Sequence, residues 1–257
     1  MNAPSTIPVP VAAGWIDKHR VAWSRKSGLR RFYQSAVYDR VLRSLASGPS
    51  LEIGSGGMFF AGYAGERGLS DLICTDVTSQ QGVQVTADVH ALPFKDESFA
   101  NVIAIHVLHH FGNPLVALRE VARMLRPGGR AHFIEPWTGA LGRLFYKYVH
   151  HEDYEPIPNP WLYEQRATKR AMDGNVAVGQ ALFVDRAEEL VLQVPSLELS
   201  RVEWFGCLSY LLTGGFQPRI GAPAAVIALF QGAEDLLPQT FMKHIGIQAL
   251  YELRKKT

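Results

Sequence analysis

The 257-residue sequence holds only two cysteines, a small net charge and no long apolar run, and each shortage excludes a class of protein. Cys74 and Cys207 form neither a disulfide framework nor a metal-ligand pair, so we expect a reducing, cytoplasmic setting and no metal. A net charge of +2 from scattered residues argues against a nucleic-acid partner. No apolar stretch reaches the roughly 18 residues of a spanning helix, so no integral membrane segment is expected. A small molecule is the partner that these exclusions favour.

The pattern of apolar residues indicates one domain. Residues 1–27 begin with a proline-interrupted stretch and are predicted to be a flexible tail, ahead of a single domain over 28–257. Residues 28–46 have the apolar spacing of an amphipathic helix. Alternating strand and helix patterns follow, with strands at 50–53, 72–76, 100–107 and 130–135 and helices at 58–67 and 114–125. This alternation predicts an α/β fold, with a parallel sheet covered by helices on both faces.

The C-terminal half adds two segments to this alternation. Residues 136–195 begin with aromatic clusters and are predicted to form a lid over the ligand site. Residues 196–204 and 243–254 are predicted to be the last two strands. The apolar insertion between them, 205–243, has three candidate roles, namely the wall of a substrate pocket, a homodimer face or a membrane contact. The membrane contact is the least supported because the insertion lacks a lysine-rich face.

The run LEIGSGGMFF places a glycine-rich turn at the end of the first strand, at the sheet edge where α/β proteins bind ligands. Glycines there permit positive φ and a close approach of the backbone to a ligand. In the dinucleotide fingerprint the sixth position must be small, but here it is Phe59, which argues against NAD. Glu52 precedes the turn inside a buried strand, where a carboxylate needs a partner such as a ligand ammonium or the backbone N–H groups of the turn.

Two further acids follow the glycine turn. Asp76 ends the second strand, where a carboxylate accepts hydrogen bonds from the hydroxyls of a ribose. Asp88 ends a short third strand and is placed to accept a hydrogen bond from the exocyclic amine of adenine, a contact that an NAD fold does not predict. Together the turn and the acids indicate an adenosine-containing ligand.

Four blocks between residues 45 and 137 now stand in one order: LEIGSGG, CTD, ADVHALPFKDESFANVIAIHVLHHF and EVARMLRPGGRAHFIEP. In these blocks the sequence resembles the class I methyltransferases that use S-adenosylmethionine, in particular their type 11 group. The resemblance implies a Rossmann-like, doubly wound, mostly parallel sheet of seven strands with an antiparallel last strand. It also implies S-adenosyl-L-methionine as the cofactor.

The resemblance assigns cofactor contacts along these blocks. The methionine end of the cofactor would lie at Glu52 and the glycine turn, the ribose at Asp76, and the adenine at Asp88 with the backbone of Val89. His106 would lie beside the methionine end through its backbone carbonyl. The full set of expected cofactor residues is Glu52, Gly54, Ser55, Gly56, Gly57, Asp76, Val77, Asp88, Val89 and His106.

The sequence also departs from the family pattern. Relatives often have glycine where Met58 stands, so a tighter turn is expected. Only eleven residues separate Asp76 from Asp88, where relatives place a helix, so a loop and a short strand are expected. The usual Ser-Phe-Asp is Ser98-Phe99-Ala100, followed by Asn101, which puts a local hydrogen bond of that aspartate in doubt. The segment RPGG, 126–129, is expected to be a turn between helix and strand.

The histidines are the candidate catalytic residues. Methyl transfer is an in-line displacement that depends mainly on positioning, and a hydroxyl acceptor is served by a histidine base. His151, His110 and His150 are the candidate bases, with His109 beside them.

The predicted function is methyl transfer to a small or lipid-like acceptor, most readily at a hydroxyl. The aromatic rings of the lid would either grip an apolar substrate or anchor the lid to the core. A pocket lined by Trp137 and Trp161 would favour a lipid-like acceptor, whereas the acids of 152–155 would favour a sugar or glycan precursor. An NAD(P)-dependent oxidoreductase and a non-catalytic cofactor-binding subunit are the alternatives from other classes.

Overall fold

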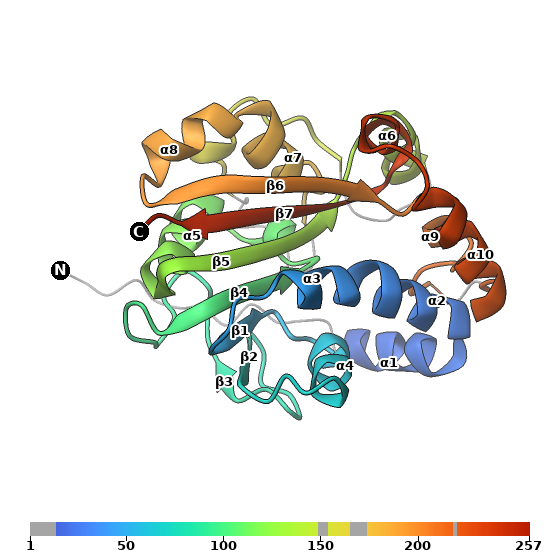
Figure 1. The fold of residues 1–257 in the computed structure, drawn as a ribbon, viewed down its shortest axis with the longest axis horizontal. Helices are drawn as coiled ribbons and strands as arrows, with labels where there is room; N and C mark the ends of the chain where they lie inside the picture. The colour runs from blue at the N-terminus through green and yellow to red at the C-terminus, as the bar shows by residue number, and fades with distance from the viewer. Residues whose placement is uncertain (1–13, 149–153, 165–173, 218–219) are drawn as a thin grey trace.

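A single mixed sheet organises the chain. The computed structural model describes residues 14–148, 154–164, 174–217 and 220–257, and in these residues seven strands run in the order β3-β2-β1-β4-β5-β7-β6 (Figure 1). The strands are β1 (Ser50–Ile53), β2 (Leu72–Asp76), β3 (Val85–Thr86), β4 (Phe99–Ile105), β5 (Leu125–Pro136), β6 (Leu197–Phe205) and β7 (Gln248–Lys255). Only β7 is antiparallel to its neighbours, β5 and β6. The predicted fold class is confirmed, including the antiparallel last strand.

Successive residues of the central strands point to opposite faces and build two cores. Val102 and Ala104 of β4 belong to one hydrophobic cluster, whereas Ile103 between them belongs to the other. Phe133 and Ile134 of β5 divide in the same way, and both are fully buried. Because both faces are covered, these strands are continuously apolar, as is typical of parallel sheets.

Helices from both ends of the chain cover the sheet. The first core receives residues of α5 (Pro114–Met124), α7 (Val178–Gln180) and α8 (Leu190–Gln193), and the second receives residues of α2 (Ser27–Phe32), α3 (Asp39–Ser44), α4 (Phe59–Glu66) and α10 (Ala224–Glu234). The remaining helices are α1 (Trp15–Arg25), α6 (Ala140–Tyr148), α9 (Leu208–Leu211) and α11 (Gln239–Ile245), with short turns η1 (Tyr33–Tyr38), η2 (Leu108–His110), η3 (Pro160–Leu162), η4 (Ala181–Asp185) and η5 (Ala187–Glu189). Helix α10 packs on α2, so the apolar insertion lies beside the N-terminal helices (Figure 1).

The N-terminal segment differs from the sequence-based expectation. Residues 15–25, which fall within the predicted flexible tail, form α1, and the Trp23 ring stacks on Phe59 with ring centroids 4.6 Å apart. The predicted helix 28–46 is present but is interrupted by the π-helical turn η1. The sequence did not predict α1 because this helix packs through aromatic side chains against residues far along the chain, such as Phe59.

The segment RPGG also differs from its expected turn. Strand β5 already begins at Leu125, and the register against β4 shifts between Phe99 and Asn101. Gly128 adopts φ of +77° within this irregular stretch. The glycines therefore lie in a bulge within the strand.

In the described part of the chain, no helix is long and apolar enough to cross a membrane.

Candidate active site

The glycine-rich turn lies between the ends of β1 and β2. Ser55 donates its backbone N–H to the Thr75 carbonyl oxygen at 2.9 Å, and Gly56 donates to Oδ2 of Asp76 at 2.9 Å. Gly54 has φ of +71°, and a Cβ atom there would lie 2.6 Å from Cγ1 of Val107. A side chain at Gly54 is therefore excluded by both conformation and space.

The residue that replaces a family glycine is held in a glycine-like conformation. Met58 has φ of 62° and stands directly before α4. A left-handed conformation costs a non-glycine residue about 1–2 kcal/mol. The turn therefore keeps the backbone path expected of glycine, although Met58 carries a side chain that lies close to Gly82.

Glu52 places a buried carboxyl group under this turn. Its side chain is 4% exposed and lines a large cavity. The Cys74 thiol donates to Oε2 at 3.5 Å. Burial raises the pKa of the Glu52 carboxyl to about 7, and the hydrogen bond from Cys74 only partly opposes this rise. A cationic group at this position would stabilise the ionised carboxylate.

Asp76, at the end of β2, links the glycine turn to the loop that follows the strand. Its Oδ1 accepts hydrogen bonds from the backbone nitrogen and the hydroxyl of Thr78, at 2.9 and 2.8 Å, while Oδ2 accepts from Gly56. A carboxylate offers about four lone-pair positions, so Asp76 can still accept from a ligand hydroxyl. Its place in the cavity wall makes that contact accessible.

Asp88 also lines the cavity and takes part in a chain of hydrogen bonds. His90 donates its backbone nitrogen to Oδ1 at 2.9 Å, and its Nδ1 also contacts Oδ1. Asn113 donates its backbone nitrogen to His90 Nε2 at 3.0 Å, which places the ring proton on Nδ1. The hydrogen bond from His90 outweighs burial and lowers the pKa of Asp88, so Asp88 is an anionic acceptor.

The remaining predicted cofactor residues lie in the same wall. His106 has φ of 55° at the end of β4 and donates its backbone nitrogen to the Ile134 carbonyl at 2.8 Å. All ten predicted cofactor residues line one cavity: Glu52, Gly54, Ser55, Gly56, Gly57, Asp76, Val77, Asp88, Val89 and His106. The short link to Asp88 contains β3, as the sequence predicts.

The departure at the Ser-Phe-Asp position is compensated by the next residue. Asn101 is fully buried, accepts from the Ala46 nitrogen at 2.8 Å and donates to the Ala46 oxygen at 2.8 Å. It also donates to the Ser50 hydroxyl at 3.1 Å. Asn101 thereby ties the segment before β1 to β4.

The predicted catalytic histidines are only partly described. His110 lines the cavity, and so does His109, whose ring lies 4.1 Å from that of His110. His150 and His151 lie outside the described residues. Sequence reasoning missed Glu135, a fully buried acid at the end of β5 that pairs with His109 Nδ1. The placement of Glu135 late in an apolar strand, as with Glu52, was the available signal.

The cavity extends well beyond the predicted cofactor residues. Its volume is about 1010 Å³. The far part is lined by α1, α6 and the insertion, with Trp15, Leu144, Phe145, Tyr148, Tyr210 and Phe216 among its residues. Among the described lining residues the acids are Glu52, Asp76 and Asp88, and no lysine or arginine is present. The far part is thus mainly apolar and holds no acid, lysine or arginine among its described residues, although His19 and Gln217 also line it.

The two tryptophans predicted to line this cavity do not do so. Trp137 is 3% exposed and donates its ring nitrogen to the Lys243 carbonyl at 2.7 Å, and Trp161 is buried in the first core. Both anchor the predicted lid segment 136–195 to the body of the protein. Among the described residues of that segment, Pro136 and several residues of α6 line the cavity.

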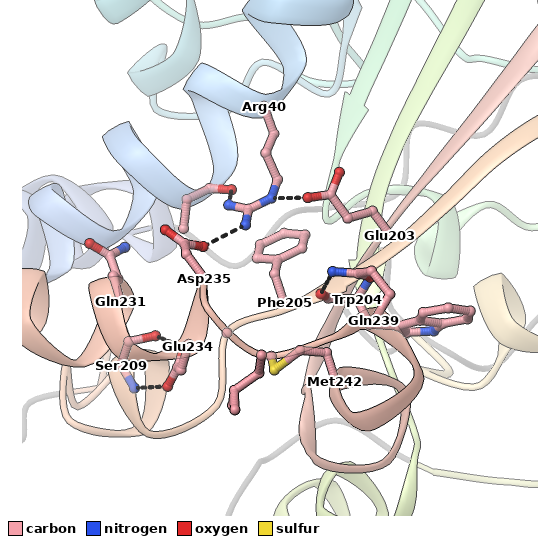
Figure 2. Close-up of a pocket in the computed structure, with 13 residues that line it drawn as sticks. Arg40, Glu203, Trp204, Phe205, Ser209, Gln231, Glu234, Asp235, Gln239 and Met242 are labelled. Carbon is pink, nitrogen blue, oxygen red and sulfur yellow. Dashed lines mark hydrogen bonds and ion pairs between the residues drawn. The ribbon is translucent and has the colours of Figure 1, made fainter.

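A second, smaller pocket of about 80 Å³ is lined by residues of α3, β6 and the insertion (Figure 2). Arg40 of α3 donates to Glu203 of β6 at 2.8 Å and to Asp235 at 3.2 Å. Its guanidinium lies 4.5 Å from the centre of the Phe205 ring. These contacts join α3, β6 and the end of α10, which is a structural role.

No cluster of three or more metal-ligating side chains occurs in the described residues.

Comparison with known proteins identifies the core. Residues 51–133 match the methyltransferase domain family. The core of this chain is a class I S-adenosylmethionine-dependent methyltransferase domain.

Named relatives share parts of this methyltransferase domain. The biotin biosynthesis bifunctional protein BioHC of Cellvibrio japonicus is 30% identical over 149 residues, covering 50% of this chain and 30% of BioHC. The ubiquinone/menaquinone biosynthesis C-methyltransferase UbiE of Bdellovibrio bacteriovorus is 36% identical over 90 residues, covering 33% of this chain and 34% of UbiE. The chain thus spans about a third of these relatives.

Solved structures show the same fold. A possible histamine N-methyltransferase of Thermotoga maritima has a TM-score of 0.54 at 17% identity, covering 95% of this chain and 96% of that chain. A methyltransferase of Archaeoglobus fulgidus has a TM-score of 0.54 at 16% identity, covering 93% and 99%.

The methyltransferase cavity fits S-adenosylmethionine, the cofactor of the family. The cofactor carries an ammonium group, a ribose diol and an adenine amine, and the wall presents the buried acid Glu52 and the acceptors Asp76 and Asp88. The space above Gly54 and Gly56 is kept open by glycines with positive φ. The donor set therefore matches the charge and hydrogen-bonding groups of the cofactor.

Proposed function

We propose that the protein transfers a methyl group from S-adenosylmethionine to a hydroxyl of a small, uncharged, apolar or lipid-like acceptor. The observation that carries this proposal is one continuous cavity with acids only at the predicted cofactor end and an apolar far part. An anionic acceptor would find no lysine or arginine among the described lining residues, and desolvating an unpaired charge is costly.

The cofactor end of the cavity is assigned residue by residue. Glu52 pairs with the ammonium group, and Gly54, Ser55, Gly56 and Gly57 pass beside the methionine end. Asp76 and the adjacent Val77 hold the ribose. Asp88 accepts from the adenine amine, and the Val89 backbone lies at the adenine ring. His106 presents its carbonyl to the methionine end.

S-adenosylmethionine supplies an electrophilic methyl group on a positively charged sulfur. The chain contributes position and exclusion of water, because in-line displacement gains most from holding the reacting atoms in line. The rings of Phe145, Tyr210 and Phe216 enclose the far part of the cavity and reduce its hydration. A histidine is the proposed base for the acceptor proton, and the sequence offers His110, His150 and His151 as candidates, with His109 beside them.

The relatives support a small acceptor. UbiE is named for quinone biosynthesis and BioHC for biotin biosynthesis, and neither name refers to a macromolecular acceptor. We extend this class to the present chain as part of the proposal. The sugar alternative depended on acids at 152–155, of which Glu155 is described and does not line the cavity.

The setting of the reaction is also part of the proposal. Both cysteines are unpaired, which agrees with a reducing, cytoplasmic location. A homodimer through the insertion 205–243 stays a prediction, and the exposed Leu229, Leu236 and Phe241 are its candidate contacts.

Methyl-labelled S-adenosylmethionine tests the acceptor class. The protein is incubated with a metabolite extract that has been divided into an organic-soluble fraction and a water-soluble, charged fraction. The proposal predicts protein-dependent label in the organic-soluble fraction, stable to base because a methyl ether resists hydrolysis. Label confined to the charged fraction would contradict the proposal.

A further inference from the structure

Glu135 and His109 form a buried pair where β5 and η2 meet behind the cavity. Glu135 is fully buried, and its Oε1 accepts hydrogen bonds from the backbone nitrogens of Val107 and Leu108 at 2.9 and 2.8 Å. Its Oε2 contacts Nδ1 of His109. Two backbone donors and one ring donor therefore fix the carboxylate in one orientation.

The pair has a defined protonation pattern. Burial raises the pKa of the Glu135 carboxyl, but the His109 ring and the Leu108 N–H outweigh it, and the net pKa lies below the usual range. An ionised carboxylate only accepts hydrogen bonds, so Nδ1 of His109 carries the proton. In the neutral ring the lone pair then resides on Nε2, at the opposite edge.

His109 faces both the carboxylate and the cavity. It is 3% exposed and lines the same cavity as Glu52 and Asp76, whereas Glu135 lies behind it and does not line the cavity. The arrangement has the order expected of a base held by an orienting acid.

Other titratable groups surround the pair. The His110 ring lies 4.1 Å from that of His109, and His106 lowers the pKa of Glu135. On the far side of Glu135, burial and then the charges of Glu135 and Asp185 raise the pKa of Tyr251, which keeps its hydroxyl neutral. Among the described residues, Glu135 is an anionic group in direct contact with His109.

We propose that His109 is the general base for the acceptor hydroxyl and that Glu135 is its positioning residue. This inference rests on the proposed function. As the oxygen–methyl bond forms and the methyl–sulfur bond breaks, the hydroxyl proton moves to Nε2 of His109. The sulfur becomes a neutral thioether, and the imidazolium is stabilised by Glu135 until its proton is lost to water.

Histidine-selective nitrogen NMR tests the pair without any acceptor. In the native protein we expect a His109 ring protonated at Nδ1, with a strongly deshielded proton that is absent from His109→Gln. Glu135→Gln should lower the pKa of His109 by at least one unit, a tenfold change in proton affinity. His244→Gln, on the exposed face of α11, is the matched control and should leave both signals unchanged.

Two results would overturn the pairing: a His109 ring protonated at Nε2 in the native protein, or an unchanged His109 pKa in Glu135→Gln. If Glu135→Gln does not fold, Glu135→Asp is used instead. Its side chain is one methylene shorter, so it keeps the negative charge but places it farther from His109. It should weaken the deshielded signal, and an unaltered signal would count against the pair.

The transfer assay then tests the catalytic role. A general base contributes about 10²–10⁴-fold, so His109→Gln should lower kcat at least 100-fold and remove the acidic limb of the pH profile. A decrease of less than threefold would overturn the assignment. S-adenosylhomocysteine binding is measured in parallel. If His109→Gln loses methyl transfer but still binds S-adenosylhomocysteine, the catalytic role of His109 is supported. If the native protein does not bind S-adenosylhomocysteine, the proposed function itself is contradicted.

Discussion

The backbone nitrogen of Gly56 donates a hydrogen bond to the Asp76 carboxylate across 2.9 Å, and this contact joins the glycine turn to the end of β2. Asp76 also binds the Thr78 backbone. One carboxylate therefore shapes both the turn and the loop on either side of the predicted ribose position. A preorganised wall of this kind lowers the ordering cost of ligand binding.

Gly54 should tolerate no side chain. Gly54→Ala introduces a Cβ atom 2.6 Å from Val107 at φ of +71°, so we expect a loss of about 1–3 kcal/mol of stability and weaker S-adenosylhomocysteine binding. Gly62→Ala is the matched control, because nothing lies within 4 Å of its Cβ position in α4. It should be neutral or stabilising by up to about 1 kcal/mol. Thermal unfolding and calorimetry distinguish the two, and equal effects would refute the steric argument.

Glu52 should make cofactor-free stability depend on pH. Its pKa is raised from 4.5 to about 7, mainly by burial, so the unfolded chain releases this proton at lower pH than the folded protein. The stabilising contribution is complete below about pH 4.5 and is lost as the pH rises through about 7, amounting to about 3 kcal/mol.

Glu52→Gln removes this titration. The variant should be more stable than the native protein at pH 8, with the difference vanishing near pH 4. It should also bind S-adenosylhomocysteine more weakly at pH 8, because the neutral amide cannot pair with the ammonium group. Urea unfolding across this range measures the difference, and parallel pH curves would contradict the buried charge.

Arg40 should contribute to stability without affecting the cofactor. Its side chain is 11% exposed and joins Glu203 and Asp235 over the Phe205 ring (Figure 2). Arg40→Met removes an ion-pair partner of Glu203, whose side chain is only 15% exposed. We therefore expect the free energy of unfolding to fall by about 1–3 kcal/mol. The exposed Arg43 supplies the control Arg43→Met. A large change in S-adenosylhomocysteine affinity for Arg40→Met would show that this pocket is coupled to the cavity.

Phe145 should contribute to acceptor binding. Phe145→Glu places a charge in the apolar part of the cavity and is expected to raise KM for the acceptor at least tenfold while leaving S-adenosylhomocysteine affinity within threefold. Leu229→Glu changes an exposed residue of α10 that does not line the cavity. It should alter neither quantity. An unchanged KM in Phe145→Glu would contradict the proposal that an apolar acceptor binds in this part of the cavity.

The fold could be predicted, and so could the grouping of the proposed cofactor residues in one cavity wall, because their signals are local. The alternation of strands and helices defined the sheet, and the glycine turn, Asp76 and Asp88 each follow a strand directly. Parallel strands end at one edge, so their proximity follows from topology. Asn101 shows the limit of this reasoning, because its hydrogen bonds to Ala46 depend on a neighbouring segment.

The acceptor side could not be predicted in the same way. Trp137 and Trp161 share an aromatic character with the true lining residues, and their burial depends on contacts such as that with Lys243, far along the chain. Helix α1 was overlooked because proline precedes it and its packing is aromatic and long-range. Glu135 was missed because its partner His109 is 26 residues away on another element.

The most direct test is a calorimetric titration with S-adenosylhomocysteine of the native protein, Asp76→Ala and the control Asp71→Ala, an exposed acid before β2. We expect micromolar binding, about −8 kcal/mol, for the native protein and the control, and at least tenfold weaker binding for Asp76→Ala. NADH should not bind. Binding of NADH without binding of S-adenosylhomocysteine would contradict the account.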